Sequence, residues 1–238
     1  MPDSADPADS NIDHDAAMRY WSTVKPDVSG MLGGYPQVSR IDLQGSANFL
    51  AKVRRLSPSS PSTLERGVDC GAGIGRVTQG LLARVCDVVD LVEPVETFVH
   101  ELRQGEVLAE WRLKGRVGNV FAVGLEDWDP PPETYHLFWN QWCLGHLTDE
   151  QVRAYLGRCR AALKQGGWIM VKENMSTHPE QEDIFDDVDS SVTRSHDKFL
   201  SLFRDAQLHV VRTEIQTGFP RELGLYPVRQ YALRPVNP

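Results

Sequence analysis

From residue 64 onward, short apolar segments alternate with amphipathic ones. This order is typical of β-strands that alternate with α-helices around a largely parallel sheet. Seven segments are predicted to be strands, near Gly67–Cys70, Val88–Val92, Val117–Val123, His136–Asn140, Trp168–Lys172, His209–Ile215 and Arg229–Leu233. The clearest helices between them cover residues 75–85, 149–163 and 194–206. A short connection over residues 215–226 joins the last two strands, which favours an antiparallel last strand. The sequence therefore predicts a doubly wound, seven-stranded α/β sheet.

The residues before this sheet form two further parts. Residues 1–12 are rich in Asp, Ser and Pro, so they cannot bury much apolar surface and are predicted to be a disordered tail. Residues 13–56 are predicted to be a helical extension. It consists of a helix over 13–24, a glycine-rich loop over 30–35 that covers a ligand, and a helix over 46–56. A Ser/Pro linker over 57–62 then leads to the α/β domain, residues 64–238.

Charge and cysteine usage exclude several classes of protein. The chain carries 25 basic and 33 acidic residues, a net charge of −8, and it has no Lys/Arg-rich stretch, so direct binding to nucleic acid is not expected. No apolar run reaches the roughly 18 residues of a membrane span, and no signal peptide is recognisable. We therefore expect a cytoplasmic protein, with the nucleus as an alternative. The four cysteines form no C-x-x-C pair, so we expect no metal site.

The turn after the first predicted strand carries three alternate glycines. The run Asp69-Cys70-Gly71-Ala72-Gly73-Ile74-Gly75-Arg76 stands where a strand passes into a helix, and glycines there let a ligand approach the backbone closely. The nicotinamide fingerprint has the spacing G-x-G-x-x-G, which this run lacks. It resembles the D-x-G-x-G-x-G turn of S-adenosylmethionine enzymes. We expect Asp69, Gly71, Gly73 and Arg76 to bind the cofactor.

The ends of the second and third strands add polar groups beside that turn. Glu93, followed by Pro94, can accept hydrogen bonds from ribose hydroxyls, because the carboxyl ends of neighbouring parallel strands share one edge of the sheet. Leu125 and Glu126 follow the third strand and can hold an adenine. Each feature alone fits a tight turn, a surface acid or a loop. Their order at three consecutive strand ends favours a nucleoside-binding site.

Two later segments and one acidic run contain candidate reactive groups. Gln141, Trp142 and His146 follow the fourth strand, and Asn174 follows the fifth. A core aromatic for Trp142, and a loop histidine bonded to backbone for His146, are the alternatives. Residues 180–191 hold six acids and no basic residue. Residues 180–183 fit a solvated face, whereas we expect Ile184, Phe185 and Val188 to anchor residues 186–191 against the sheet edge, where their carboxylates would attract a cationic substrate.

Several strings together resemble the protein α-N-terminal methyltransferase family from about residue 18 to the end of the chain. They are Tyr20-Trp21, Gly30-Met31-Leu32-Gly33-Gly34-Tyr35, the run over 69–76, Gln141-Trp142, Gly145-His146-Leu147-Thr148-Asp149, Lys172-Glu173-Asn174-Met175 and Asp186-Asp187-Val188-Asp189-Ser190-Ser191. Local departures are Glu93-Pro94, where an aspartate is more familiar, a longer segment over 176–183, and the linker near Ser57.

The resemblance implies a class I, Rossmann-like methyltransferase. Such an enzyme uses S-adenosylmethionine, releases S-adenosylhomocysteine and methylates the α-amine of proteins that begin Xaa-Pro-Lys or Xaa-Pro-Arg. Asp189 and His146 would accept the amine proton, and Asn174 would orient the amine. The other implied residues are Trp142, Asp186, Ser191, Leu32, Gly33 and Tyr226 for the peptide, and Trp21 and Gln141 for the cofactor. Ribosomal proteins are suggested as substrates by the family alone.

Two alternatives remain at this point. One is a methyltransferase of the same fold that acts on a small amine or carboxylate. The other is a nucleoside-binding protein without turnover. The sequence leaves open which proteins are modified, how many methyl groups are added and the oligomeric state.

Overall fold

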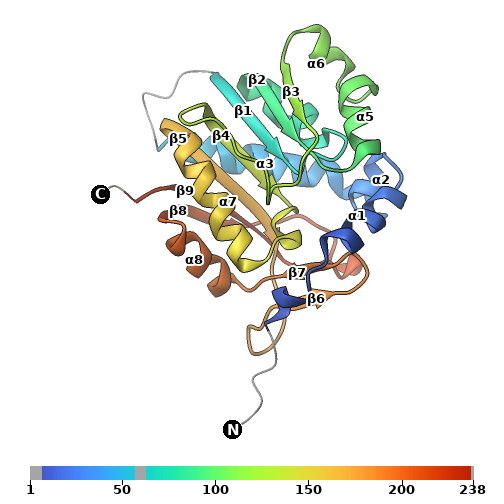
Figure 1. The fold of residues 1–238 in the computed structure, drawn as a ribbon, viewed down its shortest axis with the longest axis vertical. Coiled ribbons are helices and arrows are strands. Elements are labelled where there is room, and N and C mark those ends of the chain that lie inside the picture. The colour runs from blue at the N-terminus through green and yellow to red at the C-terminus, as the bar shows by residue number, and fades with distance from the viewer. Residues whose placement is uncertain (1–6, 57–62, 237–238) are drawn as a thin grey trace.

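The computed structural model describes residues 7–56 and 63–236, which form a seven-stranded sheet with helices on both faces (Figure 1). The strand order is β3-β2-β1-β4-β5-β9-β8. The strands are β1 Leu64–Cys70, β2 Cys86–Val92, β3 Val117–Phe121, β4 Tyr135–Gln141, β5 Leu163–Asn174, β8 Leu208–Ile215 and β9 Val228–Pro235. The pairs from β3 to β5 are parallel, and β9 is antiparallel to both β5 and β8. The predicted doubly wound sheet with an antiparallel last strand is confirmed.

Side chains of successive strand residues enter two separate cores. In β4, Phe138 contributes to the core beneath α7 (Asp149–Ala162) and α8 (His196–Asp205), whereas Leu137 and Trp139 contribute to the core beneath α3 (Ser39–Arg54). Strand residues alternate between the two faces of a sheet, so a strand covered on both faces is apolar throughout. This explains the nearly continuous apolar runs of the sequence. The remaining segments of this half are η3 Thr78–Leu82, α4 Ala83–Val85, α5 Glu96–Gln104 and α6 Ala109–Leu113.

The segment before the sheet is longer and more ordered than predicted. It contains η1 Ala8–Asn11, α1 His14–Thr23, α2 Val28–Met31 and η2 Pro36–Val38, followed by α3. The helix predicted over 46–56 begins at Ser39 instead, because Asp42 is fully buried in its first turn against partners that are distant in the sequence.

The prediction of a disordered tail is wrong for residues 7–12. The backbone N–H of Asp149 donates to Asp9 Oδ2 over 2.8 Å, and the N–H of Asp13 donates to Ser190 Oγ over 2.8 Å. Composition did not reveal these partners, because they lie more than a hundred residues away along the chain. Residues 1–6 of that tail, and the predicted linker over 57–62, lie outside the described residues.

The acidic run forms a hairpin that the sequence did not predict. Strands β6 Ile184–Asp186 and β7 Ser191–Thr193 pair antiparallel, and Figure 1 shows them beyond the edge of the main sheet, close to the N-terminal segment. The expectation that Val188 anchors this segment is wrong, because Val188 lies in the connecting turn and is 66% exposed. Val192 is the buried apolar residue instead. Within the turn, Asp187 and Val188 are exposed to solvent, whereas Ser190 is buried.

Candidate active site

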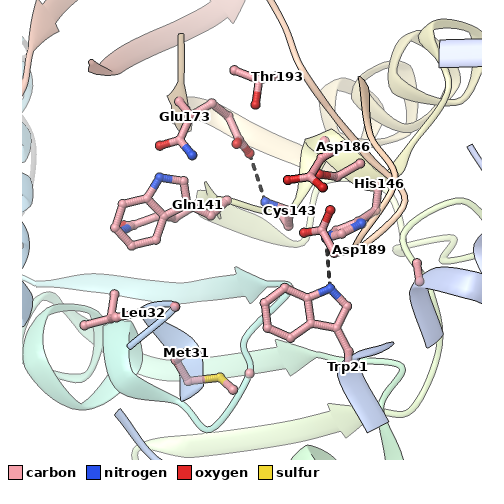
Figure 2. Close-up of a pocket in the computed structure, with 18 of the residues that line it drawn as sticks. Trp21, Met31, Leu32, Gln141, Cys143, His146, Glu173, Asp186, Asp189 and Thr193 are labelled. Carbon is pink, nitrogen blue, oxygen red and sulfur yellow. Dashed lines mark hydrogen bonds between the residues drawn. The ribbon is translucent and has the colours of Figure 1, made fainter. Parts of the chain in front are cut away.

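One cavity of about 670 Å³ opens at the carboxyl edge of β1, β2, β4 and β5. Its lining comes from almost the whole length of the chain, from α1 through the glycine turn and the hairpin to the start of β9. Every residue that the sequence predicted for the site lines this cavity, and Figure 2 shows ten of the lining side chains labelled. The structure therefore brings the predicted residues together, while their individual roles stay predictions.

The glycine turn lies where only glycine fits. Gly71 and Gly73 have φ angles of +66° and +55°, a left-handed conformation that residues with a Cβ rarely adopt. A Cβ on Gly71 would lie 2.5 Å from Cys143 Cβ, and a Cβ on Gly73 would lie 2.6 Å from Met31 Sδ. The backbone is thus packed closely between two segments that also line the cavity.

Two buried acids hold this turn in place. Asp69 accepts hydrogen bonds from Thr78, from its N–H over 3.1 Å and its hydroxyl over 2.6 Å, and so fixes the helical segment that follows the turn. Glu93 accepts from the N–H groups of Gly73 (2.8 Å) and Val95 (2.9 Å). Burial raises the pKa of both Asp69 and Glu93 to about 7. Both acids therefore position the turn, whatever contacts they make with a ligand.

A buried charge cluster behind the cavity was missed by the sequence reasoning. It consists of Asp42, Arg76, Gln141 and Lys172. Arg76 lies 2.7 Å from Asp42 Oδ2, Lys172 donates to the other carboxylate oxygen, and the amide nitrogen of Gln141 lies 3.0 Å from both oxygens. Burial would raise the pKa of Asp42, but the charges of Lys172 and Arg76 outweigh it and lower that pKa. No spacing rule links residues at positions 42, 76 and 172, so only the fold reveals the cluster.

The cluster gives the adjoining cavity wall a positive character. The cluster contains one carboxylate and two cations. Of these two cations, Arg76 lines the cavity. The guanidinium also lies 5.7 Å from the ring centroid of Trp142, within the range of a cation–π contact. Arg76 can therefore pair with an anionic group at this end of the cavity, where Asp69 and Glu93 also line the wall.

At the other end of the cavity, His146 and Asp189 lie side by side (Figure 2). The indole N–H of Trp21 donates to His146 Nε2 over 3.1 Å, so the histidine is bonded to a side chain and not to backbone at this atom. Burial lowers the pKa of His146, and the nearby Asp189 carboxylate acts in the opposite direction. Within residues 7–56 and 63–236, His146 Nδ1, Asp189 Oδ1 and the indole nitrogen of Trp142 are buried and make no hydrogen bond.

Buried polar atoms without partners are unusual in native proteins, and each asks for an explanation. All three atoms belong to residues that line the same cavity. A polar ligand that enters the cavity would supply their missing partners. Trp142 therefore does not fit the alternative of a plain core aromatic, because it lines the cavity. Its backbone is in the left-handed region, with a φ of +54°.

The loop that carries His146 is held by two buried charged residues that the sequence reasoning did not single out. Glu173 Oε1 accepts hydrogen bonds from the N–H groups of Cys143 (2.9 Å) and Leu144 (3.0 Å), and burial raises the pKa of Glu173 to about 7. From the other side, the fully buried Arg194 donates to the carbonyl of Leu144 over 2.8 Å. The loop is thus clamped between β5 and the hairpin.

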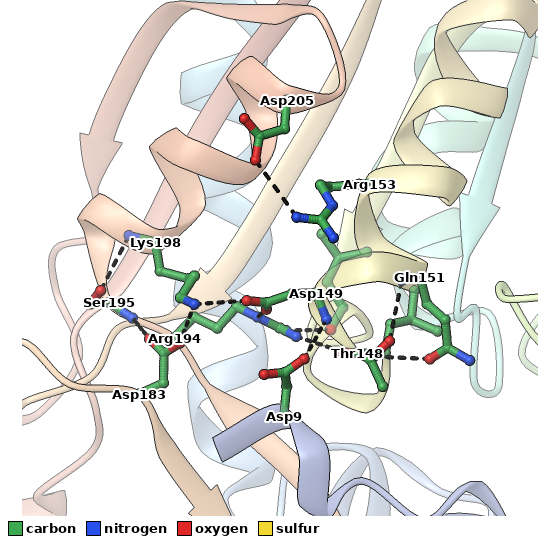
Figure 3. Close-up of polar contacts among 12 residues, drawn as sticks. Asp9, Thr148, Asp149, Gln151, Arg153, Asp183, Arg194, Ser195, Lys198 and Asp205 are labelled. Carbon is green, nitrogen blue, oxygen red and sulfur yellow. Dashed lines mark hydrogen bonds and ion pairs between the residues drawn. The ribbon is translucent and has the colours of Figure 1, made fainter. Parts of the chain in front are cut away.

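Arg194 also joins a network that ties the hairpin to α7 and α8 (Figure 3). It donates to Asp149 Oδ1 over 2.9 Å, and Lys198 donates to Asp149 Oδ2 over 2.7 Å. Asp183 accepts from the N–H of Ser195 over 2.8 Å, which attaches the segment before β6 to the start of α8. These contacts fix the hairpin, and with it Asp189, relative to the loop of His146.

Comparison with known proteins decides the family. A family model described as AdoMet-dependent proline di-methyltransferase matches residues 9–234. The chain belongs to this family. It is 44% identical over 221 residues to alpha N-terminal protein methyltransferase 1 of Schizosaccharomyces pombe, covering 92% of this chain and 94% of that protein. It is 40% identical over 218 residues to the human N-terminal Xaa-Pro-Lys N-methyltransferase 1, covering 92% and 93%.

Solved structures agree with this assignment. A SAM-dependent methyltransferase from Leishmania major superimposes with a TM-score of 0.80 at 36% identity, over 93% of this chain and 82% of that one. A phosphoethanolamine N-methyltransferase from Haemonchus contortus shares the fold alone, with a TM-score of 0.70 at 18% identity, over 93% of this chain and 49% of that one. The resemblance read from the sequence is confirmed, and with it the methyltransferase class and the use of S-adenosylmethionine.

Among the described residues, no group of three or more His, Cys, Asp and Glu side chains is placed to hold a metal ion. Across the same part of the chain, no helix is both long and apolar enough to cross a membrane.

Proposed function

We propose that this protein transfers methyl groups from S-adenosylmethionine to the α-amine of proteins that expose an N-terminal Xaa-Pro-Lys or Xaa-Pro-Arg sequence. The observation that carries the proposal is one cavity with two chemically distinct ends. A glycine turn and a cation stand at one end, and an unpaired carboxylate oxygen and an unpaired imidazole nitrogen stand at the other. The names of the Schizosaccharomyces pombe and human relatives point to the same reaction.

The residues of the first end fit the cofactor. S-adenosylmethionine carries an amino-acid carboxylate, and the excess positive charge of the buried charge cluster beside Arg76 suits it. Gly71 and Gly73 expose their backbone to the cavity, and Leu125 and Glu126 line the wall beyond Glu93. When bound there, S-adenosylmethionine supplies a methyl group whose carbon–sulfur bond breaks, with the electron pair going to sulfur, as the nitrogen–carbon bond forms. The product S-adenosylhomocysteine is then released.

The second end fits the proton that the amine must lose. An α-amine has a pKa of about 7.7 to 8.0, so near neutral pH it is mostly protonated and has no free electron pair. Asp189 takes the proton and becomes a neutral carboxylic acid, which leaves the amine with the pair that attacks the methyl carbon. A placed base contributes roughly 10²- to 10⁴-fold in rate. Asn174 at the end of β5 orients the amine from the adjoining wall of the cavity.

Substrate selection follows from the shape and charge of the cavity mouth. Proline lacks an N–H, so it leaves no donor unsatisfied against the Trp142 ring. A basic third residue would project toward Asp186 and Ser191 on the hairpin, both of which line the cavity. Leu32, Gly33 and Tyr226 also line the cavity and would contact the peptide.

Peptide methylation followed by intact mass spectrometry tests the proposal. We expect transfer to a Xaa-Pro-Lys hexapeptide, loss of transfer when its amine is acetylated, and weak transfer when Lys at position three becomes Glu. Asp189→Asn should lower the rate by at least an order of magnitude. Equal transfer to the Lys and Glu peptides would refute the acidic subsite. Label that enters only small molecules from a cell extract would instead favour the alternative of a small amine or carboxylate substrate.

The same experiment fixes the number of methyl groups added. On the resemblance alone, we propose ribosomal proteins as the first substrates to test, and a cytoplasmic location with the nucleus as the alternative. Cell fractionation and mass spectrometry of intact protein N-termini, with and without this enzyme, test both.

A further inference from the structure

The hydrogen bond between Trp21 and His146 restricts what the histidine can do. An indole nitrogen is only a donor, so His146 Nε2 must be the acceptor across the 3.1 Å contact. A neutral imidazole that accepts at one nitrogen carries its proton on the other. The contact therefore selects the tautomer with the proton on Nδ1. In this tautomer the electron pair on Nε2 is the ring's only basic site, and the hydrogen bond from Trp21 occupies it.

The surroundings of His146 favour the neutral ring. Burial is the largest influence and lowers its pKa, and His14 on α1 acts in the same direction. The groups that act in the opposite direction are the Asp189 carboxylate, the Ser190 backbone, which lies within reach of a weak hydrogen bond to the ring, and, beyond β3, Glu126. Protonation would also place an N–H on Nε2 directly against the indole N–H, and two donors cannot bond to each other.

The other side of the ring faces the site of the proposed reaction. His146 Nδ1 and Asp189 Oδ1 are both buried, both lack a hydrogen bond within the described chain, and both line the cavity (Figure 2). An Nδ1–H group is the donor that an unpaired carboxylate oxygen lacks. Such a donor holds the orientation of the carboxylate and leaves its second oxygen for the amine proton.

We propose that Trp21 is a positioning residue: it fixes His146 in the Nδ1-protonated tautomer, so that His146 acts as a donor to Asp189 and Asp189 alone accepts the proton of the substrate amine. This inference rests on the proposed function for its last step. Protons balance, because the one lost by the ammonium group is gained by Asp189, and His146 keeps its own throughout. The sequence reasoning gave Trp21 a cofactor contact and a part in covering the peptide, and gave His146 and Asp189 the same role.

NMR of the full chain with ¹⁵N-labelled histidine tests the tautomer directly, without substrate. The missing signal in His146→Gln identifies His146 among the seven histidines. We expect wild type to show the Nδ1–H form. In Trp21→Phe, which keeps an aromatic ring but removes the donor, we expect the Nε2–H form to appear and the pKa of His146 to rise by about one unit, as the loss of one hydrogen bond implies. Tyr20→Phe is the matched control, because Tyr20 packs edge-on against the Trp21 ring at 5.3 Å and should leave both unchanged.

Steady-state kinetics supply the second readout. An imidazolium beside Asp189 would make that carboxylate a weaker base, so kcat should fall as His146 becomes protonated. The acid limb of the pH profile of kcat should then move upward in Trp21→Phe by the same amount as the NMR pKa. A purely structural role for Trp21 would lower kcat at every pH without moving this limb.

The Nε2–H form in wild type would overturn the inference even if Trp21→Phe does not fold. An unchanged tautomer and pKa in a folded Trp21→Phe would also overturn it. If the spectra agree with the inference but wild type methylates no Xaa-Pro-Lys peptide, the proposed function fails and the final step to the amine fails with it.

Discussion

Replacing Asp42 by Asn tests the energetics of the buried charge cluster. The side chain is fully buried and is the single carboxylate that faces both Arg76 and Lys172. The substitution keeps the shape but removes the carboxylate that pairs with both Arg76 and Lys172, and breaking a buried ion pair in this way typically costs about 3–5 kcal/mol. For a chain of this size, each kcal/mol lowers Tm by roughly 2–4 °C, so Tm should fall by roughly 6–20 °C.

A second substitution separates charge from packing. Lys172→Met leaves one carboxylate opposite one cation, so Asp42→Asn on that background leaves one unpaired cation instead of two. The loss caused by Asp42→Asn should therefore be smaller by about 1 kcal/mol or more in the Lys172→Met protein. Glu110→Gln is the surface control, because its partner Lys114 is exposed, and it should change stability by less than about 0.5 kcal/mol.

Urea denaturation monitored by circular dichroism gives the four free energies of the cycle, and calorimetry gives Tm. Titration with S-adenosylhomocysteine provides a functional readout, since Arg76 loses its anchor in Asp42→Asn and should bind the ligand more weakly. Two results would refute the reasoning. One is a stability loss for Asp42→Asn no larger than that of the surface control. The other is an identical loss with and without Lys172, which would mean that charge balance does not govern the cluster.

Three further predictions concern the turn and the loop beside it. Gly71→Ala should lower both Tm and the affinity for S-adenosylhomocysteine more than Gly115→Ala does. The two glycines have left-handed φ angles, but a new Cβ would meet an obstacle at Gly71, where it would lie 2.5 Å from Cys143 Cβ, and none at Gly115. Equal losses in the two variants would contradict the packing argument. Burial raises the pKa of Glu173 to about 7, so the stability that its neutral form contributes is present below its usual pKa and is lost as pH rises through 7. In unfolding titrations, the wild type should therefore lose stability relative to Glu173→Gln between pH 5 and 8. Parallel stability curves for the two proteins would disprove this prediction. Arg194→Lys should lower kcat roughly 10- to 100-fold with little change in cofactor affinity. The reason is that Arg194 holds the loop that carries His146 and does not contact the cofactor end of the cavity. An unchanged kcat would exclude this role.

The parts of the site that the sequence revealed are those coded by neighbouring residues. The glycine turn is one example, since Gly71 and Gly73 each adopt a conformation that a local motif specifies. The sheet is another, because strands covered on both faces must be apolar along their length. Glu93 was predictable as well, because it directly follows such a strand beside the turn.

The parts that were missed depend on partners far apart in the chain. In the sequence, nothing distinguishes Asp42 from other polar helix residues. Its ion pair with Lys172 forms only in the folded chain. Arg194 reads as the start of a surface helix, yet it is fully buried because three carbonyl and carboxylate groups surround it. Val188 shows the opposite failure: an apolar residue was expected to be buried, but the tight turn of the hairpin leaves it in solvent. Tertiary contacts decided each case.

The position of β9 has a consequence for how the enzyme becomes active in the cell. Among the described strands this one comes last in the sequence, yet it lies between β5 and β8 inside the sheet, and the segment that leads into it lines the cavity. A nascent chain that has not yet released these residues from the ribosome exposes an unpaired β5 and has an incomplete cavity wall. Methyl transfer can therefore begin only after translation has passed β9, so a chain truncated before that strand should be inactive and prone to aggregation.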